Sequence, residues 1–500
     1  RDAAKFGGES GPVNGVASVS QFHTDGYRVH SAADRQLGNV KVRFRAGDDT
    51  SITLLGNSVR QPEVQDPQGL NRTQLADNPR QVNPTVLNFN TRKTADQNQG
   101  GVRLDQRLNA ANRVEAVLYG GNRFVEQFLG FQTNGNVNLD TDYGGGALRY
   151  FWTGSRVRLS GGAEYETLAQ RRKGFDNDFG VPGTQRRDED DDVASTGLFA
   201  QGEWQFADRW IAHAGVRKSR VGFTVDDHVG ARSGQVTYTG TTPVAGLVFR
   251  VAPATSLYAN VGRGFETPTL VEIANRTGST TGINFDLAAS RSRHTELGVK
   301  TLLGRHARVN AALFNIVTEN EIVVDRNVNG RASFKNVGHT DRDGFELAAD
   351  TVSSGPWHAR LAYTYLRARF RESFDTVVSG SAVTVAGGNQ LPSVPRTLLY
   401  GELGFHRAPF FARLEGLHKS SVAVNDSNSE FADAYVVWNG VVGLTQERAA
   451  WRLTEFARVD NLTSRNYVGS VIVNENAGRY YEPAPLRAWT LGIQAALRFL

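Results

Sequence analysis

The feature that most constrains this chain is a period-two alternation of apolar and polar residues that recurs along its length. It is clearest in residues 487–499, where Trp489 and Leu491 are apolar and Thr490 between them is polar. Such an alternation places one face of a β-strand against an apolar medium and the other against a polar one. Comparable segments lie at residues 40–46, 157–166 and 257–262. No comparable stretch keeps a helical period, so the sequence predicts an all-β protein.

The connections between these segments alternate in length. Tight turns fall near residues 8–14, 47–49, 109–112, 153–155, 207–208, 252–254, 304–305, 353–356, 406–409 and 446–449. Longer polar loops lie between them at residues 25–34, 61–95, 129–141, 171–192, 226–234, 266–290, 375–395, 425–433 and 461–486, with one short hairpin turn at residues 327–330. Short periplasmic turns and long extracellular loops are typical of a transmembrane antiparallel β-barrel. A soluble sandwich or propeller gives no reason for this alternation.

The tryptophans agree with a membrane barrel. All seven lie near the predicted strand ends, where amphipathic rings prefer the membrane interface. No run of 18 apolar residues exists, which excludes a transmembrane helix. Cations inside the strands, among them Arg43 and Arg158, fall on the polar face and are expected to point into the lumen.

The strand count is odd. The turns divide the chain into about 21 strands, a size class whose lumen is usually plugged rather than open. The first and last strands then both run toward the short-turn rim, and two such strands cannot close an antiparallel barrel. We therefore expect one ascending strand ahead of Arg1, which would give 22 strands in the complete protein.

Composition excludes several kinds of site. Cysteine is absent, which excludes disulfides, thiolate metal sites and cysteine nucleophiles. The net charge of +5 is modest for 500 residues and gives no argument for a nucleic-acid partner. The acidic run at residues 188–192 lacks the spacing of a calcium loop, and we interpret it as an exposed acidic loop. No nucleophile–base set and no metal-ligand spacing is found, so neither an enzyme, a metal site nor a resident cofactor is expected. Methionine is also absent, and the chain is interpreted as a mature, truncated or engineered piece.

Three segments carry a resemblance to a known family. They are residues 262–269 (GRGFETPT), 336–346 (NVGHTDRDGFE) and 459–467 (VDNLTSRNY), and they resemble the C-terminal barrel of TonB-dependent outer-membrane receptors. Four further stretches resemble the pyrroloquinoline-quinone transporter branch: TDGYRVHS at 24–31, NEIVVD at 320–325, GSVIVN at 469–474 and GRYYEP at 478–483. The resemblance covers nearly the whole chain.

The resemblance implies an outer-membrane location and a receptor built of separate barrel and plug domains. The chain would be the barrel domain, residues 1–500, without the plug domain and the TonB-binding segment that precede the barrel in the family. Its implied partners are a small-molecule ligand, outer-membrane lipid and lipopolysaccharide, the barrel-assembly machinery, and TonB through the plug segment. A monomer is expected. Phe499 would be the terminal aromatic that the assembly machinery recognises.

The implied ligand is a scarce small anion, pyrroloquinoline quinone in the first place. Arginine, lysine and aromatic side chains suit such a tricarboxylate through charge-assisted hydrogen bonds and stacking. The candidate residues lie in two loops and at one strand end: Arg171, Arg172, Lys173, Phe175, Arg263, Arg479, Tyr480 and Tyr481. Each of them could instead be a solvated loop residue or a site for lipopolysaccharide phosphate.

The sequence thus leaves three hypotheses of function open. The first is TonB-dependent uptake of pyrroloquinoline quinone. The second is a ferric-siderophore receptor. The third is a passive or engineered pore, because a large barrel without its plug would conduct.

Overall fold

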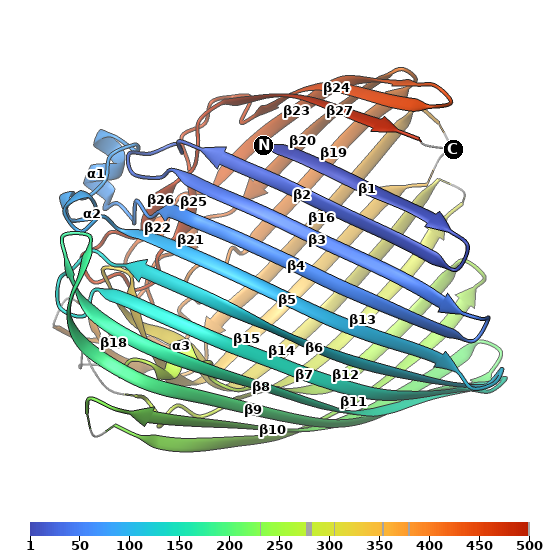
Figure 1. Ribbon diagram of the computed structural model, residues 1–500, viewed down its shortest axis with the longest axis horizontal. Coiled ribbons are helices and arrows are strands. Elements are labelled where there is room, and N and C mark those ends of the chain that lie inside the picture. The colour runs from blue at the N-terminus through green and yellow to red at the C-terminus, as the bar shows by residue number, and fades with distance from the viewer. Residues whose placement is uncertain (231, 277–282, 305, 353–354, 379–380, 499–500) are drawn as a thin grey trace.

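One antiparallel sheet of 21 strands forms most of the molecule. The computed structural model describes the chain except for residues 231, 277–282, 305, 353–354, 379–380 and 499–500. In Figure 1 the sheet curls round, so that β1 to β9 pass in front of the strands of the far wall. The all-β class, the barrel and the count of about 21 strands are confirmed.

The strands of this sheet follow one another in chain order. They are β1 (Asp2–Ser10), β2 (Val13–Thr24), β3 (Ala33–Ala46), β4 (Thr50–Gln65), β5 (Arg92–Arg107), β6 (Asn112–Phe128), β7 (Asn136–Thr153), β8 (Val157–Asp178), β9 (Val181–Ala207), β10 (Trp210–Asp227), β11 (Gly234–Ala252), β12 (Thr255–Glu266), β13 (Ser290–Leu303), β14 (Ala307–Val328), β15 (Arg331–Thr351), β16 (Trp357–Phe370), β19 (Thr397–Arg407), β20 (Phe410–Lys419), β23 (Tyr435–Glu447), β24 (Trp451–Asp460) and β27 (Ala488–Leu497).

The long connections contain the remaining elements. These are α1 (Arg72–Asp77), α2 (Pro84–Asn88), α3 (Leu270–Ile273), and three small two-stranded sheets: β17 (Phe374–Val378) with β18 (Ser381–Val385), β21 (Val422–Ala423) with β22 (Phe431–Ala432), and β25 (Val468–Val471) with β26 (Tyr481–Pro483). Asn71 caps α1 and Thr269 caps α3, each through a reciprocal capping box that satisfies free backbone N–H groups. In the described part of the chain, no helix has the length and apolar character that a membrane crossing needs.

One predicted loop is wrong. Residues 171–192 were expected to be a long loop, but β8 and β9 continue as a paired hairpin as far as Asp178 and Val181. The acidic run 188–192 therefore lies on β9 and is not an exposed loop: Glu189 and Asp191 are buried there. Both predictions failed for the same physical reason. Polar residues occupy the inner positions of this extension, where other charged side chains satisfy them, so no apolar alternation marks the strand.

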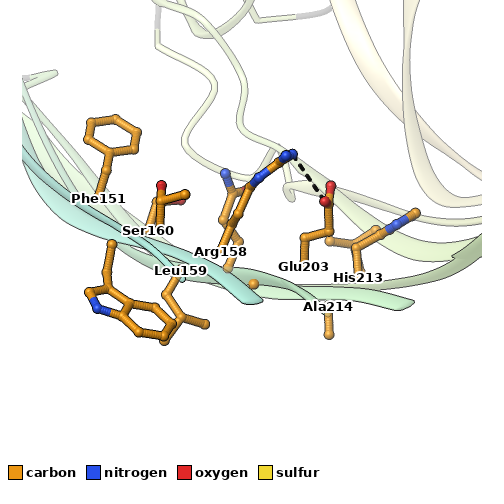
Figure 2. Close-up of a pocket in the computed structure, with 12 residues that line it drawn as sticks. Phe151, Arg158, Leu159, Ser160, Glu203, His213 and Ala214 are labelled. Atoms are coloured by element: carbon orange, nitrogen blue, oxygen red, sulfur yellow. Dashed lines mark hydrogen bonds and ion pairs between the residues drawn. The ribbon is translucent and has the colours of Figure 1, made fainter. Parts of the chain in front are cut away.

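The two faces of the wall differ as the alternation predicts. Figure 2 shows Arg158, Glu203 and His213 on one side of the sheet, with Leu159 and Ala214 on the other. Arg158 donates to Glu203 at 3.2 Å across the inner face, while Leu159 is exposed on the outer face. The inward direction predicted for Arg158 is confirmed.

Aromatic rings lie over glycines of the neighbouring strand. Phe314 is paired with Gly344 and Phe456 with Gly492 across the sheet. A Cβ added at Gly344 would lie 2.1 Å from the Phe314 ring, and one at Gly492 would lie 2.2 Å from the Phe456 ring. The missing side chain thus makes room for a ring that covers the backbone, a device that fixes strand register.

The two end strands run the same way. Within the described residues β1 pairs only with β2, and β27 pairs only with β24. Both end at the short-turn rim, as the odd count predicted. The additional ascending strand stays a prediction, and Phe499 lies outside the described residues.

Candidate functional site

The long-loop rim is built of packed loops. Three apolar clusters hold them: one around Phe223 and Ile273, one around Phe370 and Val385, and one around Val424 and Tyr481. Each cluster joins a connection to the upper part of a strand or to another connection. Because apolar burial orders these segments, the mouth of the barrel is a folded structure with a defined shape.

The hairpin of β14 and β15 reaches across this mouth. Asn329 and Gly330 form its turn, both with positive φ (51° and 98°), as an Asn-Gly turn of the type that matches strand twist requires. The Asn329 carbonyl accepts a hydrogen bond from Gln68 Nε2 at 3.1 Å, in the connection between β4 and β5. Ten strands of the sheet, β5 to β14, separate these two connections. The hairpin therefore bridges opposite walls.

Two further connections hold the hairpin. Asn474, which precedes β26, donates to the Val324 carbonyl at 2.6 Å and accepts from the Asn327 N–H at 3.1 Å. On the other side Arg331 donates to the Asn134 carbonyl and lies over the Phe131 ring at 4.8 Å. The hairpin tip is thus the point where connections from three regions of the chain meet.

A buried charge cluster lies next to this tip. It contains three arginines, Arg172, Arg187 and Arg331, and two carboxylates, Glu189 and Asp191. Arg187 and Glu189 are each only 2% exposed and are 2.6 Å apart, and Arg172 Nε lies 3.6 Å from Glu189. We call these five residues the mouth cluster. Three guanidinium groups against two carboxylates leave one positive charge in excess.

The pKa values of the mouth cluster follow from burial. Loss of solvent, with Arg187 next to it, lowers the pKa of Arg172 to about 9. The same two causes lower the pKa of Arg331 to about 10. Burial, followed by the neighbouring Glu189 carboxylate, raises the pKa of Asp191 to about 6. At neutral pH Arg172 and Arg331 therefore remain charged, and Asp191 is mostly ionised.

The candidate residues of the loop predicted at 171–192 lie on both faces of β8. Arg172 is buried in the mouth cluster, whereas Arg171 is exposed on the outer row and bonded to Asp188 at 2.7 Å. Lys173 and Phe175 are half-buried on the following positions of the strand. Of this set, the structure brings only Arg172 together with other cations at the mouth.

The candidates Arg479, Tyr480 and Tyr481 are buried in the last long connection, between β24 and β27. Arg479 forms an ion pair with Glu475 at 3.0 Å and bonds to Asn329 of the hairpin tip. Tyr481 is 1% exposed, and its hydroxyl donates to Glu430 at 2.6 Å. Burial and that hydrogen bond raise the pKa of Tyr481. Tyr480 packs in the same cluster. These side chains hold the loop together, and their contact with a ligand stays a prediction.

Arg263 lies elsewhere. It follows Val261 on the outer row of β12, and its side chain is exposed. Like Arg171, it therefore faces away from the lumen.

Sequence reasoning missed Arg187, Arg331 and Asn329. Arg187 belongs to a stretch interpreted as a solvated loop, and Arg331 follows a turn that was noted only for being short. The usable signal was the Asn-Gly pair at Asn329 and Gly330, which predicts a tight hairpin. Nothing in the sequence indicated that this hairpin crosses to the opposite wall.

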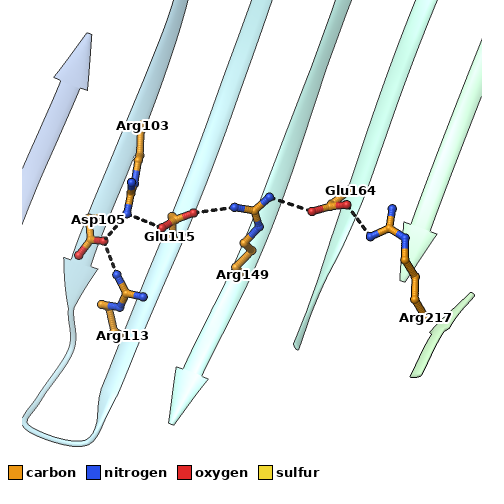
Figure 3. A network of polar contacts seen from close by, with 7 residues as sticks. All are labelled: Arg103, Asp105, Arg113, Glu115, Arg149, Glu164 and Arg217. Carbon is orange, nitrogen blue, oxygen red and sulfur yellow. Dashed lines mark hydrogen bonds and ion pairs between the residues drawn. The ribbon is translucent and has the colours of Figure 1, made fainter. Parts of the chain in front are cut away.

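The inner wall below the mouth carries a ladder of ion pairs, shown in Figure 3. Arg149 on β7 bonds to Glu115 on β6 at 3.0 Å and to Glu164 on β8 at 2.8 Å. Arg217 on β10 reaches over β9 to Glu164 at 2.7 Å. It can do so because Gly197 stands between them: a Cβ there would lie 2.2 Å from the guanidinium. Four arginines and three carboxylates make up the ladder in Figure 3, so the lumen wall there is polar and each carboxylate of the ladder is paired with arginine.

Among the residues that the structure describes, no three histidine, aspartate or glutamate side chains are grouped to hold a metal ion. Arginine side chains such as those of the mouth cluster can hold an anionic group through charge and hydrogen bonding.

Comparison with known proteins identifies the fold. Residues 23–462 match the family described as TonB dependent receptor-like, beta-barrel. The probable TonB-dependent siderophore receptor PiuA of Acinetobacter baumannii is 25% identical over 222 residues, which are 42% of this chain and 29% of that protein. The matched region thus spans less than a third of that relative.

Solved structures agree with this match. The siderophore receptor PiuA from Acinetobacter baumannii superposes with a TM-score of 0.80 at 14% identity, covering 99% of this chain and 78% of that one. The ferric citrate transporter FecA in its unliganded form gives 0.80 at 15%, covering 98% and 75%. The copper transporter OprC gives 0.75 at 16%, covering 97% and 76%. These likenesses concern the fold.

The family is one of outer-membrane transport receptors, not of enzymes. Its model covers most of the sheet described above, from the end of β2 to the end of β24. The chain belongs to the TonB-dependent receptor family and matches the β-barrel part of these receptors.

Proposed function

We propose that this barrel belongs to a receptor that imports a scarce anionic metal complex, a ferric siderophore, across the outer membrane. The observation that carries the proposal is the mouth cluster with its excess positive charge. It lies beside a hairpin that crosses the entrance, so its buried positive charge acts on a ligand that arrives from outside. Arginine binds carboxylate and catecholate-type oxygens through paired N–H donors, which a lysine cannot reproduce.

The comparisons support this ligand class. The relatives with solved structures include a siderophore receptor, a ferric citrate transporter and a copper transporter. The three names refer to a siderophore, to ferric citrate and to copper. A metal complex of net negative charge is the ligand class that agrees both with those names and with the positive charge of the mouth cluster.

Pyrroloquinoline quinone is the second candidate. Four stretches of the sequence resemble its transporter branch, and as a tricarboxylate it also suits the mouth cluster. A binding experiment separates the two candidates. The full-length parent protein in detergent is titrated with ferric siderophores of different denticity and, separately, with pyrroloquinoline quinone. Binding is measured by the change in tryptophan fluorescence. Saturable binding of a ferric siderophore at submicromolar concentration supports the proposal. Saturable binding of the quinone alone would assign the protein to the second candidate.

We further propose that transport is energised by TonB through a plug segment outside this chain. The test is ligand uptake by cells that carry the full-length parent, with and without TonB. Uptake that is unchanged without TonB contradicts active transport and favours a passive pore. For the chain by itself, planar-bilayer recordings measure whether the barrel conducts.

A further inference from the structure

Five cations lie together on the outer face of the barrel, on three of four consecutive strands. They are Lys218 and Arg220 on β10, Arg263 on β12, and Arg291 and Arg293 on β13. We call them the outer basic patch. No role in the transport function accounts for them, because they face away from the lumen.

The outward direction follows from the strand alternation. On β10 the exposed row runs Ala214, Val216, Lys218, Arg220, and Figure 2 shows Ala214 on the side of the sheet opposite to inward-pointing His213. On β12 the row containing Val261, 53% exposed, continues to Arg263. On β13 the row containing Leu297, 57% exposed, continues to Arg293 and Arg291.

The patch begins where the apolar belt ends. Between the short-turn rim and the cations, the outer rows of these strands are mostly apolar, with Thr255, Thr295 and Thr301 as the hydroxyl-bearing members, and the cations follow on the side of the long loops. In a membrane barrel, this is the level of the lipid headgroups of the outer leaflet. Cations placed there meet the phosphates of the surrounding lipid.

Two of these arginines oppose each other directly. Arg263 and Arg293 are cross-strand partners on the same face of the sheet. Like charges in this position repel and destabilise the pair. In the described residues no ion pair or side-chain hydrogen bond relieves either of them, nor Lys218, Arg220 or Arg291, whereas the arginines of the inner wall are paired. An anion bound between the two guanidinium groups would remove the repulsion.

The strand β11, which lies between β10 and β12, adds hydroxyl groups to the patch. Thr239 and Thr241 of β11 are exposed on the outer row and pair with Arg220 and Lys218. A phosphate accepts hydrogen bonds from hydroxyl and guanidinium donors alike. The nearest outward carboxylate is Glu319, opposite Arg291. One carboxylate against five cations leaves the patch strongly positive.

Farther round the barrel the same level is neutralised. Arg367 and Arg369 on β16 also lie on the outer row, but Arg367 is 2.9 Å from Asp343 and Arg369 is 3.6 Å from Asp341. The excess positive charge is therefore confined to β10, β12 and β13 and is not a general property of the rim.

We propose that the outer basic patch binds the phosphate groups of a phosphorylated glycolipid in the surrounding leaflet, with one phosphate held between Arg263 and Arg293. A lipid is the occupant because the patch faces the bilayer, continues an apolar belt that would receive the acyl chains, and is separated by the wall from the lumen.

The test uses the whole chain in detergent micelles and a bisphosphorylated lipid A as the probe, with bound lipid measured by native mass spectrometry. Each cation near a lipid surface contributes about 1 kcal/mol, or roughly fivefold in affinity. The double variant Arg263→Gln/Arg293→Gln is therefore expected to bind the probe about 25-fold more weakly. The matched control is Arg367→Gln/Arg369→Gln, from the neutralised part of the same level, which should retain the original affinity. If the first double variant does not fold, Lys218→Gln/Arg220→Gln replaces it with the same expected loss.

Three results would overturn the proposal. The first is a double variant that binds within twofold of the original chain. The second is equal retention of the same lipid after both phosphates have been removed. The third is complete displacement of lipid A by inorganic phosphate at about 10 mM, which would show a site for the free anion instead of the lipid.

Discussion

At the residue scale, the mouth cluster differs from the ladder of ion pairs on the inner wall in its burial: Arg187 and Glu189 are each 2% exposed, whereas the side chains of Arg149 and Arg217 in the ladder are 37% and 39% exposed. The ladder around Arg149 and Glu164 pairs cations with anions along a more exposed wall, where water screens their charges. Arg172 and Arg331 lie in a buried site, where a charge–charge interaction is less screened than in water.

The first prediction concerns Arg172. Replacing it with glutamine removes one positive charge from the mouth cluster, and we expect affinity for an anionic ferric siderophore to fall about tenfold, as for one lost charge-assisted hydrogen bond of about 1.5 kcal/mol. The measurement is a ligand titration of the full-length parent. Arg158→Gln serves as the control, because Arg158 lies on the inner wall near the short turns and is already paired with Glu203. Equal losses in both variants would contradict a specific role of the mouth.

The second prediction concerns pH and rests on Asp191, which lies above the apolar belt. Its pKa is raised to about 6, so the folded protein keeps this proton up to a higher pH than an ordinary aspartate would. When the pH falls through 6, protonation removes a negative charge and increases the positive excess of the mouth cluster. Affinity for an anion should therefore rise from pH 7 to pH 5, by a few-fold, and this rise should disappear in Asp191→Asn. The ligand chosen must not titrate in that range. A rise of the same size in Asp191→Asn would assign the pH effect to other groups.

At the element scale, the pairs of glycine and aromatic ring set the register of neighbouring strands. Gly344→Ala places a methyl group against the Phe314 ring, and we expect a loss of about 1–3 kcal/mol in the free energy of unfolding, as for other overpacked sites. Gly401→Ala is the matched control, since an added Cβ at Gly401 has no atom within 4 Å. Guanidinium-induced unfolding in lipid, followed by tryptophan fluorescence, compares the two. Equal stability of both variants would show that the ring is free to move aside.

The sequence predicted these elements unequally. Alternation works where lipid meets one face, so segments of β3, β8 and β12 and the last strand were recognisable. It fails in the extension of β8 and β9, because Arg187, Glu189 and Asp191 replace apolar residues at the inner positions. Arg172 could be predicted as a candidate from its charge and loop. Arg331 could not, because its proximity to Arg172 depends on a hairpin that crosses the barrel.

At the scale of the whole molecule, the β14–β15 hairpin narrows the entrance. Replacing residues 326–333 by an Asn-Gly turn would leave Val324 and Phe334 paired but remove the bridge to Gln68. Single-channel conductance in planar bilayers should then increase, because the tip no longer occupies the mouth. Gln68→Ala, which removes one hydrogen bond and keeps the tip, should change the conductance little. An unchanged conductance in the shortened variant would show that the tip does not limit the passage.

The same hairpin also has a mechanical consequence. A hollow ring deforms most easily by flattening into an oval, and a strut across its diameter resists that motion in one direction. With its tip fixed to Gln68, Asn134 and Arg479, the hairpin is such a strut at the extracellular end only. The barrel should therefore be stiff at its entrance and compliant at its periplasmic rim. A ligand that releases the tip would make the entrance compliant as well, and the barrel would then deform along its whole length.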